Sequence, residues 1–178
     1  MIRYIALFFT FISFNLDAQW RPNPASGNEV TAEVSSALSK FKANPALDLY
    51  FDNAYGFVVF PSIKKAGIGI GGASGKGQVF QEGELIGNSR VTQVSLGIQF
   101  GAQAFKEIIF FKDSIALGRF IRGNFEFGAQ ASAVALTAGV SAEIEYNDGV
   151  AIFTEPNGGL MYEASVGGQK FTFVPINK

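Results

Sequence analysis

The side chains that could do chemistry in this chain form a restricted set, because its 178 residues include no cysteine and no histidine. Disulfides, metal sites with nitrogen or sulfur ligands, and triads that need histidine or cysteine are therefore excluded. Acid–base work is left to carboxylates, and these are scattered along the chain: Glu107, Asp113, Glu126, Glu143 and Glu145. We therefore predict that the protein is not an enzyme and that it holds no cofactor and no metal.

Glu143 and Glu145 are two residues apart, so in a strand they would share one face. Such a pair is one way to build an acid and a base side by side. On a strand at the edge of a sheet, however, two carboxylates are more simply explained as a solvated face. We prefer the solvated face.

A glycine-rich stretch, GIGIGG at positions 67–72, matches the dinucleotide-binding pattern GxGxxG. That pattern binds a pyrophosphate only where it follows a strand and opens a helix. Here glycine alternates with isoleucine, and no helical stripe follows. We instead predict a strand with a bare face at Gly67, Gly69 and Gly71, against which a backbone, a ring or a ligand packs closely.

Two lysines follow the apolar run 57–60, which Pro61 is expected to end because it cannot donate a ladder hydrogen bond. This predicts an exposed basic turn at positions 62–65. Each lysine near an anionic membrane contributes about 1 kcal/mol, so binding would be weak and sensitive to salt unless an apolar residue also inserts. The alternative is that the lysines merely keep the turn soluble. The candidate lipid-binding residues are Ile63, Lys64, Lys65 and Lys76.

Composition indicates a single domain with a β-rich core. Hydrophobic residues make up 48% of the chain, the formal net charge is −1, and 19 phenylalanines stand beside 21 glycines. Large rings packed over small residues fit these counts. A charge balance this close to zero gives no electrostatic footprint for nucleic acid, so we expect no nucleic-acid partner.

The first residues have the layout of a secretory signal peptide: Arg3, an apolar run at 5–14, and the small residue Ala18. The run is too short for a spanning helix, and an uncleaved anchor is the second interpretation. We expect a signal peptide at residues 1–18, a Pro-rich tether at 19–27 and one domain at 28–178. The protein would then be exported and be periplasmic, outer-membrane-associated or secreted.

Periodicity predicts an α+β fold. Val30, Val34, Leu38 and Phe41 lie on one helical stripe, and a second short helix is expected from Asn44. The domain would place these N-terminal helices on a Gly/Phe-rich sheet or a partly closed barrel. Strands are expected near 57–60, 67–72, 78–81, 84–86, 91–104 (one long strand or a bent pair), 108–111, 125–140, 142–146, 150–154, 159–166 and 170–174, with a short helix at 114–119.

Four blocks, in order between about Val30 and Phe173, carry a family resemblance: GFVVFPSIKKAGIGIGGASGKGQVF, VSLGIQFGAQAFKEIIFF, GNFEFGAQASAVA and GGLMYEASVGGQKF. Together they resemble the SYLF domain. That resemblance implies an α+β module with helices before a curved antiparallel sheet. The family includes endocytic adaptors that bind phosphoinositides and actin, and also secreted or periplasmic bacterial proteins.

The resemblance leads us to expect a non-enzymatic extracytoplasmic SYLF-type module that binds anionic lipid or phospholipid surfaces. The alternative is a structural or scaffold protein of the cell envelope. Such a protein would bind a protein partner through a sheet edge or the glycine face.

If the signal peptide is removed after Ala18, the exported protein begins at Gln19. Mass spectrometry of the protein from its native host should then give a mass without residues 1–18. Detection of an intact Met1 would contradict cleavage.

Overall fold

The computed structural model describes residues 29–68, 70–96, 102–123, 125–127, 132–136, 145–157, 164–165 and 167–176. The expected signal peptide and tether lie outside these residues. So do Gly69, Glu143 and most of the strand expected at 125–140.

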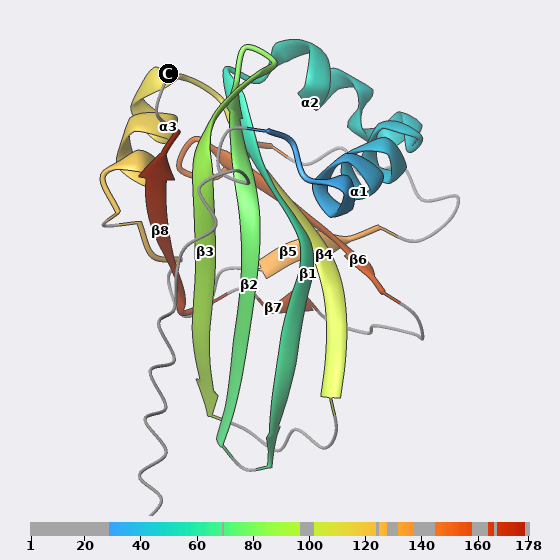
Figure 1. The fold of residues 1–178 in the computed structure, drawn as a ribbon, viewed down its shortest axis with the longest axis vertical. Coiled ribbons are helices and arrows are strands. Elements are labelled where there is room, and N and C mark those ends of the chain that lie inside the picture. Colours follow the sequence, from blue (N-terminus) through green and yellow to red (C-terminus); the bar gives the residue numbers. More distant parts are fainter. Residues whose placement is uncertain are drawn as a thin grey trace, which may run out of the picture.

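One sheet forms the centre of the molecule (Figure 1). Its strand order is β7-β5-β6-β4-β1-β2-β3-β8, and the six strands from β6 to β8 run antiparallel. Because β7 and β8 lie at opposite ends of this order, the described strands do not form a closed barrel. The strands are β1 (Gly56–Ile68), β2 (Ile70–Gln81), β3 (Glu84–Leu96), β4 (Ala102–Phe111), β5 (Ser132–Ala135), β6 (Val150–Pro156), β7 (Ala164–Ser165) and β8 (Gln169–Pro175).

In the described part of the chain, four short helical segments accompany the sheet: α1 (Ala32–Lys42), the 3-10 helix η2 (Pro45–Leu47), α2 (Asp48–Asn53) and α3 (Ser114–Ile121). Polar caps set the starts of α1 and η2, as Thr31 accepts a bond from the amide of Val34 and Asn44 accepts one from the amide of Ala46. Val30 precedes α1 and is 43% exposed, so it does not belong to the buried stripe.

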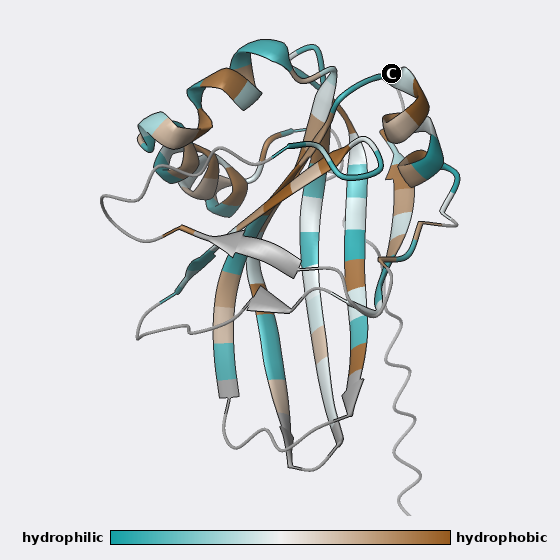
Figure 2. Cartoon of the chain, turned by 180° about the vertical axis from the view of Figure 1, so that it is seen from behind, coloured by the Kyte–Doolittle hydropathy of each residue, from teal (hydrophilic) through white to brown (hydrophobic). Residues whose placement is uncertain are grey.

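Helices cover both faces of the sheet. Val34, Phe41 and Leu47 from α1 and η2 belong to one core with Phe57 and Phe110. The helical residues Ala116, Leu117 and Phe120 of α3 belong to a second core on the opposite face. In Figure 2 the longest hydrophobic stretches of the strands lie at the end of the sheet that the helices cover. Central strands are therefore buried on both sides, which explains the unbroken apolar runs at 57–60, 108–111 and 150–153.

Pro61 does not end the first strand, and the predicted basic turn at 62–65 is wrong. β1 continues to Ile68, and its pairing with both neighbours shifts register around Phe60 and Pro61. Such a shift is a β-bulge, whose extra residue makes no ladder hydrogen bond. A proline at this position therefore removes no hydrogen bond from the ladder. The bulge therefore lets a proline lie inside a central strand.

The glycine-rich stretch is a hairpin rather than one strand. Gly67 pairs with Gly71 and Ile68 pairs with Ile70, so the stretch ends β1 and begins β2. Close packing occurs further along β2, at Gly77, which lies opposite the bulge. A Cβ built there would lie 2.4 Å from the backbone oxygen of Val59 and 2.6 Å from Cδ1 of Phe60.

The predicted curvature is confirmed by contacts between β4 and β8, which three strands separate. In a flat sheet they would be roughly 19 Å apart. Instead, Nε2 of Gln169 on β8 donates to Glu107 on β4 at 3.1 Å. The ring of Phe171 on β8 also lies 5.8 Å from that of Phe60 on β1, which two strands separate from β8. We call the inner side of this curl the concave face. There β2 presents only small residues below Val79: Gly71, Ala73, Gly75 and Gly77.

Replacing Gly77 by alanine should lower the free energy of unfolding by about 1–3 kcal/mol, because the added methyl group meets backbone and ring atoms of the bulge. Gly72→Ala is the matched control on the same strand, since its Cβ would approach nothing closer than 3.6 Å. Urea denaturation of both variants measures the difference. Equal free energies of unfolding for the two variants would show that the bulge moves to accommodate the methyl group.

Candidate functional site

Beyond the helices, the sheet face that carries α1 is exposed on β1, β2, β3 and β8 (Figure 1). We call this surface the open face. Every second residue of each strand points to this surface. Most of these residues are small or basic. Its exposed residues are Lys64, Ala66, Gly72, Ser74, Lys76, Arg90, Thr92, Val94, Lys170, Thr172 and Val174.

Three cations form a diagonal across the open face. Lys76 and Arg90 are direct partners in the β2–β3 ladder, and Lys64 is the partner of Ser74, two residues from Lys76. Among the ion pairs of the described residues, none involves these three side chains, whereas Lys170 pairs with Glu126 at 3.4 Å. Like charges directly opposite each other destabilise a sheet. The pairing of Lys76 with Arg90 therefore destabilises the sheet locally, so a contribution to stability does not explain why both residues are basic.

The four predicted lipid-binding residues do not lie together. Lys64 and Lys76 share the open face, as a basic site requires. Ile63 is fully buried, because the pleat turns it into the core on the concave face, so its expected exposure is wrong. Lys65 also points to the concave face, where it is half-buried.

Arg90 was missed by sequence reasoning. Its place beside Lys76 depends on the β2–β3 register, which a two-residue turn at Glu82 and Gly83 sets. Both turn residues have positive φ, 50° and 83°, as tight hairpins require. The Glu-Gly pair between two strand patterns is the sequence signal for this turn. Counting residues back from the turn does not identify the partner of Lys76, however, because the register shifts again after Val79.

The candidate carboxylates do not converge within the described residues. Asp113 caps α3 by accepting a bond from the amide of Ala116 at 2.9 Å. Glu126 is exposed and paired with Lys170, and Glu145 is exposed. In this part of the chain no group of three or more acidic residues is placed to hold a metal ion.

Glu107 differs from the other carboxylates because it is fully buried on the concave face. The adjacent Lys106 points to the opposite face and pairs with Glu155 at 3.2 Å, so it does not neutralise Glu107. Burial raises the pKa of Glu107 to about 8, and the hydrogen bond from Gln169 lowers it only in part. Glu107 is therefore mostly protonated at neutral pH.

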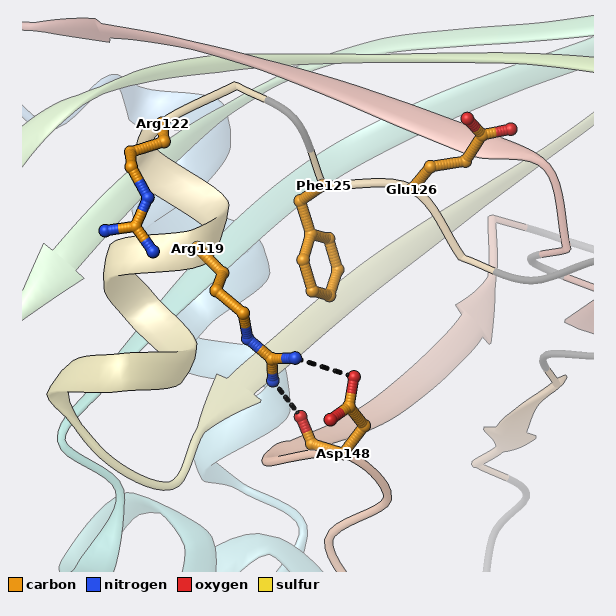
Figure 3. A pocket seen from close by; sticks show the side chains of 5 residues that line it. All are labelled: Arg119, Arg122, Phe125, Glu126 and Asp148. Carbon is orange, nitrogen blue, oxygen red and sulfur yellow. Dashed lines mark hydrogen bonds and ion pairs between the residues drawn. The ribbon is translucent and has the colours of Figure 1, made fainter.

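A pocket of about 240 Å³ lies between α3 and the turn that precedes β6 (Figure 3). Arg119 donates to the Asp148 carboxylate at 2.8 Å and also to its backbone oxygen. Glu126, a further lining residue, is paired with Lys170 outside the pocket. Arg122 extends along α3, away from Asp148. With the acids engaged and the arginines diverging, the pocket favours no class of ligand.

None of the helices in the described part of the chain is long and apolar enough to cross a membrane.

The raised pKa of Glu107 predicts how stability depends on pH. Between about pH 4.5 and 8 the folded state holds a proton that the unfolded state has lost, so stability should fall as pH rises, by about 1.4 kcal/mol per unit. Glu107→Gln removes the group, and its stability should exceed that of the wild type increasingly above pH 5. Denaturation across this range measures the difference. Glu82→Gln, at an exposed turn, should keep the wild-type pH profile, and a parallel profile for Glu107→Gln would contradict the prediction.

Comparison with known proteins found no matching family model. The chain is 23% identical over 163 residues to beta cell expansion factor A of Aeromonas veronii. The alignment covers 84% of this chain and 59% of that protein, so this chain spans less than two thirds of its relative. The chain is therefore distantly similar, over most of its length, to beta cell expansion factor A.

Proposed function

We propose that the protein is a non-enzymatic, extracytoplasmic SYLF-type module that binds anionic lipid surfaces through its open face. The observation that carries this proposal is the diagonal of unpaired cations formed by Lys64, Lys76 and Arg90. The distant similarity to beta cell expansion factor A is in keeping with a SYLF-like family.

The chemistry of the open face suits phosphate head groups. Small side chains at Ala66, Gly72 and Ser74 leave the basic groups standing clear of the sheet. A guanidinium such as that of Arg90 binds phosphate oxygens in pairs, and lysines add point charges. The open face can therefore lie against a layer of phosphates without burying an unpaired charge.

Apolar contact on this surface would come from Val94 and Val174, which are 75% and 62% exposed. They replace Ile63, whose burial removes it from the site. Three cations at about 1 kcal/mol each give about 3 kcal/mol, which by itself is weaker than millimolar binding. Binding should accordingly be sensitive to salt, and several copies on one vesicle would strengthen it.

The proposal is tested by co-sedimentation of the exported form with vesicles of phosphatidylcholine alone or mixed with phosphatidylglycerol, at low and high salt. We expect binding only to the anionic vesicles, and only at low salt. Lys76→Glu combined with Arg90→Glu should lower the partition coefficient by at least about tenfold, because each reversal removes an attractive charge and adds a repulsive one.

The matched control is Lys112→Glu combined with Arg122→Glu, which changes net charge equally at exposed positions off the open face. Binding by this control should stay near that of the wild type. If both double variants lose binding to the same degree, net charge rather than the open face is responsible. If neither does, the open face is not the site, and an envelope protein becomes the partner to seek.

A further inference from the structure

Around Glu107 on the concave face, three buried oxygen atoms find no hydrogen-bond partner among the described residues: Oε1 of Glu107, Oγ1 of Thr154 and Oε1 of Gln169. Each of these residues is completely inaccessible to solvent. Native proteins leave few buried polar atoms unpaired, and three in one place call for an explanation.

These oxygens belong to one cluster. Glu107 and Thr154 are direct partners in the β4–β6 ladder and point to the same face. Gln169 reaches them from β8, where its Nε2 donates to Oε2 of Glu107 at 3.1 Å. Its Oε1 is bonded to the same carbon as that nitrogen, so the curl of the sheet brings a carboxyl, a hydroxyl and an amide oxygen together.

No positive side chain of the described residues neutralises this cluster. Among the strand residues with given burial, Lys65 is the positively charged side chain on the concave face. Lys65 is the ladder partner of Gln103, four residues along β4 from Glu107, which is roughly 13 Å. α3 packs on this face with Ala116, Leu117 and Phe120, none of which carries charge. Lys106 and Glu126 are paired elsewhere.

We propose that Glu107, Thr154 and Gln169 form an interior site for one monovalent cation, Na⁺ or K⁺. Carboxylate, hydroxyl and amide oxygens are the donors that hard cations prefer. A single carboxylate balances one positive charge, whereas a divalent ion would leave a buried charge uncompensated. The site is distinct from the open face, and its existence does not depend on lipid binding.

The cation and a proton compete for Glu107. In the empty site the carboxyl group keeps its proton, and binding of the cation releases that proton to solvent. The cation should therefore stabilise the protein most at alkaline pH and oppose the alkaline loss of stability. At acidic pH Glu107 keeps its proton and the cation does not bind.

Thermal unfolding in NaCl, KCl and choline chloride at equal ionic strength tests the proposal. At about pH 9 either Na⁺ or K⁺ should raise Tm by about 3 °C relative to choline, which is too large to enter the site. At about pH 5 the three salts should give the same Tm. The ²³Na NMR line should broaden with the protein at the alkaline pH, and added K⁺ should reverse this if K⁺ is preferred.

Glu107→Gln and Thr154→Val should each abolish the cation-dependent rise in Tm, and the control Glu126→Gln should retain it. Thr154→Val keeps the shape of the side chain and so carries the test if Glu107→Gln does not fold. Equal Tm values in all three salts at alkaline pH would overturn the proposal and assign the three oxygens to internal water. A rise that persists in both variants would overturn it as well.

Discussion

The curl of the sheet depends on how closely β1 and β2 approach each other at the bulge. Phe60 occupies the space that a side chain on Gly77 would fill, and the small residues of β2 leave the concave face free for rings. Phe171 of β8 can therefore pack on Phe60 of β1, although two strands separate β8 from β1. Without this absence of side chains the sheet would flatten and the second core would open.

Covering the two faces at one end of the sheet has a consequence at the other end. The helices bury the central strands where these are most apolar, and the same strands then extend beyond the helices with small and basic residues. One chain thus has a core that helices cover on both faces and a cationic extension of the same strands. The extension is held in place by the core, so its charges are fixed relative to one another rather than carried on a loop.

The curl also encloses Glu107. A carboxyl group on a central strand would reach solvent in a flat sheet, but here β8 folds over it and Gln169 supplies its hydrogen bond. Desolvation then holds the proton on the group at neutral pH. A buried acid of this kind reduces stability in alkali, and its retention beside two further unpaired oxygens is the reason to regard the cluster as a site.

The sequence by itself determined the α+β class, the N-terminal helices, the short helix at 114–119 and the strands at 78–81 and 84–86. These depend on neighbouring residues, so a local pattern carries them. Of the two interpretations of 91–104, the single long strand is wrong, because β3 ends at Leu96 and β4 begins at Ala102. These two strands are not neighbours in the sheet.

Only the tertiary structure decided the positions of Ile63, Lys65, Arg90 and Glu107. A bulge shifts which residues face the core, and a one-residue shift moves every later side chain of a strand to the other face. Ile63 was consequently placed on the wrong side. The partnership of Lys76 with Arg90, and that of Glu107 with Gln169, joins residues that register and curvature bring together. Neither is encoded in any short stretch of sequence, because each depends on how whole strands pair and bend.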